Sequence, residues 1–191
     1  MSILPKARPR ATRAIVIEAA KRQWKKDRPG EAFPDRFVFG CRSYYFRTMG
    51  DPNSGDRNIY DDAVAVVGPD TFAMFNANTD PSPFRKGVAT LMVGCHPFRF
   101  GNHGISRPGG GYPAMRPNTK DEALPVARDG ERGRSKRDGI AINIHRGGYN
   151  TTSSLGCQTI PPAQWDAFYA LARHEMGGEP FWYILVDGPI N

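Results

Sequence analysis

The sequence predicts a β-rich fold, made mainly of β-strands with one or two helices. Glycine and proline are frequent, with 21 and 17 residues among 191, which is typical of short strands joined by tight turns. Several short apolar runs are bounded by turn residues, and only two segments have helical patterning. A chain of this length, 39% hydrophobic, is sufficient for one domain with a buried core.

The first strands are expected between residues 37 and 75. Residues 37–46 have strand composition. The apolar runs 63–67 and 72–75 flank a Gly-Pro-Asp-Thr turn signal, and this arrangement predicts a β-hairpin.

The middle of the chain predicts two more strands and a long loop. Residues 88–93 and 97–100 are apolar enough to form a second strand pair. Residues 109–136 open with three glycines and predict an irregular stretch.

Positive charge is concentrated at the N-terminus. Residues 1–36 carry ten Lys/Arg and four Asp/Glu, which accounts for most of the net charge of +7. Residues 12–26 predict a basic helix with Ile15, Ala19 and Trp24 on its apolar side. Such a helix could contact nucleic acid, anionic lipid or an anionic wall polymer. The alternative is a helix packed on the domain with its charges in solvent.

The second helix is expected near the C-terminus. Residues 162–176 place Trp165, Phe168 and Ala172 at core spacing. The apolar run 181–186 follows and predicts a strand.

The most informative stretch leads from a histidine to a cysteine. Apolar residues alternate along 140–145, and the strand period of two places His145 on the face opposite the isoleucines. Cys157 follows twelve residues later, preceded by two serines, a leucine and a glycine. Small residues before the cysteine allow backbone N–H groups to turn toward a bound carbonyl oxygen.

This pair of side chains is suited to acyl transfer. A free thiol has a pKa of about 8.5, so little of it is thiolate at neutral pH unless a base assists. His145 can accept the thiol proton and give it to a leaving amine if the two side chains approach within about 3 Å. The alternative is a structural histidine and a buried, inert cysteine.

The segment resembles the active-site signature of the L,D-transpeptidase catalytic domain. In that family histidine-glycine precedes serine-histidine-glycine-cysteine, and here His145-Arg146-Gly147 precedes Ser154-Leu155-Gly156-Cys157. A helix and a strand follow the cysteine in the family, as expected here. The resemblance implies that Cys157 is the nucleophile and His145 the base. It also implies that a backbone carbonyl just after His145, in the Arg146-Gly147 segment, orients the base, and that N–H groups near Gly156 and Cys157 form the oxyanion hole.

The resemblance also implies fold and substrate. Residues 37–191 would form an L,D-transpeptidase-like β-sandwich, preceded by the basic helical segment 1–36. The substrates would be peptidoglycan stem peptides, joined by transpeptidation or cleaved as by a carboxypeptidase or endopeptidase. The residues expected to bind substrate are Ser154, Asn150, His103, Tyr112 and Gln158.

The sequence departs from the family at three points. Leu155 stands where the family has a second histidine, and Gln158-Thr159 replaces an apolar residue followed by arginine. The spacer between His145 and Cys157 is also shorter. The missing arginine affects recognition of a substrate carboxylate, whereas the histidine and cysteine of the acyl-transfer chemistry are both present.

Three other functions are compatible with parts of the sequence. A zinc-dependent peptidoglycan peptidase would need its ligands among His96, His103, His145 and His174, but no H-x-H or H-E-x-x-H motif is present. We therefore expect no metal ligands and no cofactor. Papain-like peptidases place cysteine before histidine, whereas only His174 follows Cys157. A basic, non-enzymatic nucleic-acid-binding module is the remaining alternative, and it predicts salt-sensitive binding.

The sequence also suggests where the protein is made. The N-terminus lacks the apolar core of a signal peptide, and no run is long enough for a membrane span. Three cysteines without a C-x-x-C motif argue against a disulfide framework. We expect synthesis in the cytoplasm, action on the cell wall after release or export, and no obligate protein partner. Variants of this kind are expected among bacteriophage-encoded proteins.

Overall fold

The computed structural model describes residues 2–50, 56–106, 108–131 and 136–190. Most of the regular structure in these ranges is β-strand, so the predicted β-rich class is confirmed. In chain order the elements are α1 (Arg13–Asp27), β1 (Phe37–Arg42), β2 (Asp62–Val67), β3 (Phe72–Ala77), β4 (Ala89–Leu91), β5 (Gly94–His103), β6 (Tyr112–Pro117), the 3₁₀ helix η1 (Lys120–Glu122), β7 (Ala123–Arg128), β8 (Lys136–Ile140), β9 (Ile144–Arg146), β10 (Gln158–Ile160), α2 (Pro162–Glu175) and β11 (Phe181–Asp187). Within the described ranges, no helix combines the length and apolar character that a membrane crossing requires.

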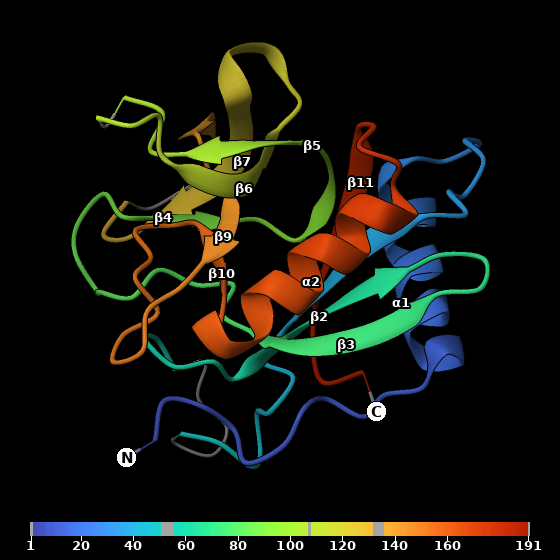
Figure 1. The fold of residues 1–191 in the computed structure, drawn as a ribbon, viewed down its shortest axis with the longest axis horizontal. Coiled ribbons are helices and arrows are strands. Elements are labelled where there is room, and N and C mark those ends of the chain that lie inside the picture. Colours follow the sequence, from blue (N-terminus) through green and yellow to red (C-terminus); the bar gives the residue numbers. More distant parts are fainter. Residues whose placement is uncertain (1, 51–55, 107, 132–135, 191) are drawn as a thin grey trace.

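The strands form one large sheet and one small sheet (Figure 1). The large sheet has the order β10-β9-β6-β5-β11-β1-β2-β3, and the small sheet has the order β4-β7-β8. A bridge between Asn78 and Thr159 connects the end of β3 to β10, so the large sheet nearly closes on itself. The finer expectation of an L,D-transpeptidase-like sandwich stays a prediction.

The central strands are buried on both faces, because a helix covers each side of the large sheet (Figure 1). Alternate residues of β2 belong to two different cores: Val64 and Val66 share one with α2, and Ala65 shares the other with α1. This two-sided burial explains why β2 is a continuous apolar run. The predicted hairpin is confirmed, since β2 and β3 pair antiparallel and Val67 lies opposite Phe72.

The N-terminal helix is packed on the sheet. Thr12 caps α1, and its buried side includes Val16, Ala19 and Trp24. The Trp24 ring meets the ring of Trp182 in β11 edge to face, with centroids 5.2 Å apart. Ile15, expected on the apolar side, is only partly buried. The basic segment therefore contributes its helix to the same core as the strands that follow.

Two predictions for the middle of the chain were wrong. Segments 88–93 and 97–100 contain strands, but β4 pairs with β7 in the small sheet while β5 pairs with β6 and β11 in the large one. The stretch 109–136 is not irregular throughout, because it contains β6 and β7. Both strands carry prolines, which obscured a burial pattern that places Met115 and Leu124 in the core.

The continuous strand predicted over 140–145 was also wrong. Ala141 adopts a left-handed conformation, with φ of 55°, and this ends β8 at Ile140. Ile140 is exposed, whereas Ile144 begins β9 with its side chain buried. The change of direction places the segment after Ala141 in the large sheet and the segment before it in the small sheet.

Candidate active site

The register of two short parallel strands brings the histidine and the cysteine together. In β9 and β10, Ile144 lies opposite Gln158 and His145 lies opposite Thr159. Continued by one residue, this register places Cys157 beside Asn143, two positions before His145. Side chains two residues apart share a face of a sheet, and adjacent strands are about 4.8 Å apart. The twelve residues from His145 to Cys157 therefore include the loop that brings the chain back so that β10 runs parallel to β9.

His145 is held in one orientation by two oxygen atoms. Its Nδ1 atom lies 2.7 Å from the backbone carbonyl oxygen of Arg146 and 3.1 Å from the hydroxyl of Tyr112. An imidazole that donates Nδ1–H to a carbonyl keeps its lone pair on Nε2. The side chain is buried, with a relative exposure of 2%, although a strand pattern that places it opposite the isoleucines would favour an exposed histidine.

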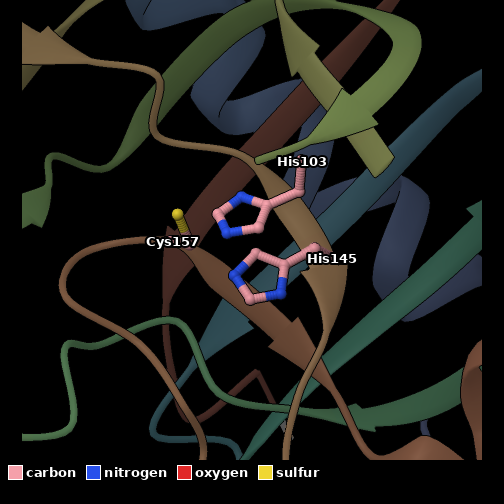
Figure 2. Close-up of side chains that lie close together, drawn as sticks. All are labelled: His103, His145 and Cys157. Carbon is pink, nitrogen blue, oxygen red and sulfur yellow. The ribbon is translucent and has the colours of Figure 1, made fainter. Parts of the chain in front are cut away.

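A second imidazole lies against the first. The rings of His103, at the end of β5, and His145 are stacked with centroids 4.1 Å apart and an interplanar angle of 24°. Tyr112 is directly opposite His103 in the β5–β6 pair, and its ring lies 5.3 Å from that of His103. Figure 2 shows a nitrogen of each imidazole on the side that faces the sulfur of Cys157. The structure thus brings together four of the residues expected to form the site.

The Cys157 thiol is partly buried and lies among polar backbone groups. The N–H of Asn143 lies 3.4 Å from Sγ, and the thiol lies 3.7 Å from the carbonyl oxygen of Ala141. Burial raises the pKa of the thiol to about 11, while the Asn143 N–H and the positive charge of Arg116 act in the opposite direction. The thiol is therefore protonated at neutral pH, and its reaction as a nucleophile requires a base.

Glycines shape the loop between the two side chains. Gly156 has a φ of 136°, and a Cβ at this position would lie 2.7 Å from the carbonyl oxygen of Ala89. A Cβ on Gly147 would lie 2.2 Å from the hydroxyl of Tyr60. The N–H of Gly147 donates to the carbonyl of Ile160. Both glycines are required for close packing of the loop against neighbouring strands.

Other residues expected at the site have different environments. The Ser154 hydroxyl donates to the carbonyl oxygen of Cys157 and accepts from the N–H of Gly156. Gln158 is buried and its side chain contacts Gly156 and Tyr183. Ser154 therefore stabilises the turn before Cys157, and Gln158 connects this turn with Tyr183.

Two further expected residues lie on the surface. Asn150 is exposed in the loop after β9. Arg146 is also exposed, and its guanidinium group lies 5.8 Å from the centre of the Tyr112 ring. Both are accessible to a ligand approaching the loop.

Sequence reasoning missed two residues that contact or influence the site. Asn143 donates its backbone N–H toward the sulfur, and its side-chain nitrogen lies 3.0 Å from Nδ1 of His103. Its position two residues before His145 is the signal that could have identified it. Arg116, on β6, is buried and paired with Glu122. No local pattern connects Arg116 with Cys157, because its effect acts through space.

The three side chains in Figure 2 also form a set of metal-ligand type. One ligand atom from each of His103, His145 and Cys157 lies within 4.8 Å of the other two. His103 and His145 are among the candidate ligands of the zinc alternative, but no standard spacing connects them with Cys157, which is why no metal ligands are expected from the sequence.

Two cavities flank the segment that leads to Cys157. One has a volume of about 280 Å³ and is lined by Ile142, Leu155 and the cationic residues Arg85, Lys86 and Arg128. The other has a volume of about 480 Å³ and is lined by Leu155 and by residues of the 151–154 segment and the 82–83 segment. Leu155 lines both cavities, and its side chain is 63% exposed, whereas His103, His145 and Cys157 line neither of the two.

No protein-family model and no curated protein matches this chain.

Proposed function

We propose that this protein is a cysteine-dependent acyl-transfer enzyme that acts on the peptide stems of bacterial peptidoglycan. The observation that carries the proposal is the position of the His145 imidazole. Its Nδ1 is fixed by the Arg146 carbonyl, and a ring nitrogen lies within 4.8 Å of the Cys157 sulfur, a separation that side-chain rotation reduces to hydrogen-bond distance for proton transfer. An oriented base beside a thiol is the arrangement that nucleophilic catalysis requires.

The reaction begins with transfer of the thiol proton to Nε2 of His145. The sulfur of Cys157 then attacks an amide carbonyl carbon of the substrate, and a tetrahedral intermediate forms. When it collapses, the C–N bond breaks and the amine leaves with the proton from His145, so that a thioester remains on Cys157. An amine or water then attacks the thioester and regenerates the thiol. Attack by an amine gives a cross-link, and attack by water gives hydrolysis.

We assign stabilisation of the developing oxyanion to the backbone N–H of Cys157. The N–H of Gly156, the other expected donor, already donates to the hydroxyl of Ser154. That bond fixes the turn and with it the direction of the Cys157 peptide group. A fixed N–H donor of this kind contributes about 3–4 kcal/mol to the transition state in acyl-transfer enzymes.

The cavities support a substrate with two peptide branches and a carboxylate. Stem peptides are acyl donors and acceptors, and the two cavities share Leu155, two residues before Cys157, in their linings. Arg85, Lys86 and Arg128 make one of them basic, which suits a carboxylate of the stem. They would replace the arginine that the family places after its cysteine.

The first test is mass spectrometry of purified muropeptides incubated with the wild-type protein and with Cys157→Ala. We expect new products with the wild type and none with the variant, and the product masses distinguish transfer from hydrolysis. Cys95→Ala is a matched control, since this partly buried cysteine lies on β5 outside the site. Equal product formation by Cys157→Ala would contradict the proposal.

A second test concerns the basic cavity. Arg85→Ala and Lys86→Ala should raise KM for stem peptides and leave thioester formation intact, because both residues are exposed and contribute binding only. Lys120→Ala, which removes an exposed cation from η1, is the control. An unchanged KM in both cavity variants would remove this cavity from the substrate-binding site.

A further inference from the structure

We propose that His103, His145 and Cys157 bind one divalent cation of the zinc class, and that this cation competes with substrate for the thiol. Two imidazoles and one thiolate are a ligand set used by Zn²⁺ in sites that keep a fourth position for water or another ligand. Magnesium and calcium prefer oxygen ligands, so this set selects against them. The binding site follows from geometry alone, while the effect on the thiol rests on the proposed function.

The ligand atoms are almost at metal-binding separation. Bonds of about 2.0–2.3 Å in a tetrahedral site separate neighbouring ligand atoms by about 3.4–3.7 Å. The three atoms in this structure lie within 4.8 Å of one another. Closure by roughly 1 Å, which small side-chain rotations supply, completes the site. The two rings are already stacked with one nitrogen each toward the sulfur (Figure 2).

The atoms behind the ligands are those that orient metal-bound histidines. Such histidines donate the ring N–H that does not bind the metal to a backbone carbonyl or a carboxylate, which fixes the tautomer and the direction of the ring. Nδ1 of His145 lies 2.7 Å from the carbonyl oxygen of Arg146. Its Nε2 is thereby the atom presented to a cation, in the same tautomer that base catalysis needs.

Asn143 can perform the same role for His103. Its side-chain nitrogen lies 3.0 Å from Nδ1 of His103, and within the described part of the chain its buried Oδ1 atom has no hydrogen-bond partner. Rotation of the amide by 180° exchanges these two atoms and places the oxygen beside Nδ1, where it accepts the ring N–H. Nε2 of His103 then has its lone pair toward the sulfur. We assign this amide orientation to the metal-bound form.

Metal binding changes the state of Cys157. The thiol proton is released to solvent when sulfur coordinates the cation, and the thiolate is then held by the metal. A coordinated sulfur and a coordinated His145 Nε2 leave no nucleophile and no base for acyl transfer. Binding of the cation and formation of the thioester therefore exclude each other.

The direct test uses cobalt as a spectroscopic probe for the full-length protein after treatment with a chelator. We expect one equivalent of Co²⁺ to bind, with the visible absorption of a four-coordinate site and a sulfur-to-cobalt charge-transfer band, and Zn²⁺ to displace it. Cys157→Ser should remove the charge-transfer band, and His103→Ala should weaken binding at least tenfold. His174→Ala, which removes an exposed histidine from α2, should change neither. An absent thiolate band in the wild type, or unchanged affinity in His103→Ala, would overturn the assignment.

A gain in affinity provides a test that does not depend on loss of folding. Asn143→Asp places a carboxylate next to Nδ1 of His103 and should tighten Co²⁺ binding, because a charged acceptor strengthens the ligand. Asn143→Leu has similar volume and no acceptor, and it should weaken binding. Equal affinities in the two variants would contradict the role given to Asn143.

The effect on activity is measured separately. Product formation from muropeptides by the chelator-treated protein should stop when one equivalent of Zn²⁺ is added and return when the chelator is restored. Activity that increases with Zn²⁺ would overturn the competition. Cobalt binding without any activity under either condition would support the metal site and remove the proposed function, so the two failures are distinguishable.

Discussion

The large sheet contains two parallel strand pairs that differ in what they bury. In the central pair, β1 and β11, the side chains are mainly apolar and lie between α1 on one face and α2 on the other. In the pair β9 and β10, the buried side chains include His145, Gln158 and Thr159. Burial of a polar group costs free energy unless it is hydrogen-bonded. Burial of apolar side chains in the central pair therefore stabilises the fold. This stabilisation offsets the free-energy cost of burying polar groups in the β9–β10 pair.

Two cysteines in these regions show the same contrast. Cys41, in β1, is buried, and burial with the charges of Asp62 and Asp187 raises the pKa of its thiol above the ordinary range. Cys157 is also in a buried environment, but the Asn143 N–H and the charge of Arg116 favour its thiolate. Burial raises the pKa of both thiols, and the neighbouring charges add to this shift at Cys41 but oppose it at Cys157.

The largest effect is expected for His145→Ala. Loss of the base should reduce muropeptide turnover by about 10²–10⁴-fold, whereas the same change at the exposed His174 should have no effect. Initial rates measured at neutral pH provide the comparison. Turnover within a few-fold of wild type would show that the β9–β10 pair does not supply the base.

The next effect concerns stability of the central region. Phe168, on α2, is fully buried and meets the Phe75 ring edge to face. Phe168→Ala should reduce the free energy of unfolding by about 3–5 kcal/mol because it leaves a cavity. Leu155→Ala, at an exposed side chain near the site, should change it by less than about 0.5 kcal/mol. Urea unfolding of both variants tests the contrast, and similar losses would contradict it.

A smaller effect is expected from a polar residue at the start of the central hairpin. Asp61 is buried, and one of its carboxylate oxygens has no hydrogen-bond partner among the residues that the structure describes. Burial and the nearby Asp62 raise the pKa of Asp61 well above its ordinary value of 3.8. The folded protein therefore retains a proton that the unfolded chain releases, so Asp61 lowers stability as pH rises above about 4.

Asp61→Asn removes this proton linkage. The variant should be more stable than the wild type at alkaline pH, by a few °C in Tm, and the difference should shrink toward pH 4. Thermal unfolding across this pH range gives the measurement. A wild-type advantage that grows with pH would reverse the sign and contradict the raised pKa.

The smallest effect is expected for Tyr112→Phe. The hydroxyl of Tyr112 is the second oxygen near Nδ1 of His145, and the Arg146 carbonyl remains when it is lost. One hydrogen bond contributes about 0.5–1.5 kcal/mol, so turnover should fall by about two- to tenfold with little change in Tm. A loss as large as that of His145→Ala would make Tyr112 the principal orienting group.

The parts of the fold that were predicted correctly depend on local signals. The β2–β3 hairpin has its strands and its turn within sixteen residues, and α2 carries its apolar stripe and its proline start in one segment. The pairing of β4 was predicted wrongly because its partner, β7, is more than thirty residues away along the chain. The break in the strand at Ala141 was not predicted, because an alanine in a sequence does not indicate a positive φ.

The candidate site was likewise predicted correctly only where the signals are local in the sequence. The order of His145, Gly156 and Cys157 along the chain was sufficient to suggest a thiol and a base. The stacking of His103 on His145 depends on β5, β6 and β9 meeting in one sheet, which no local pattern reports. The contribution of Arg116 also required the three-dimensional arrangement.

The bridge between Asn78 and Thr159 joins the two edges of the large sheet, and Cys157 lies two residues before Thr159. Both backbone hydrogen bonds of the bridge, each 2.8 Å long, join the last part of β3 to β10. The thiol therefore lies close to the point at which hydrogen bonds join the two edges of the sheet. The β9–β10 pairing sets the position of Cys157 relative to His145, so a mutation that breaks the Asn78–Thr159 bridge should shift β10 and displace the sulfur from the base.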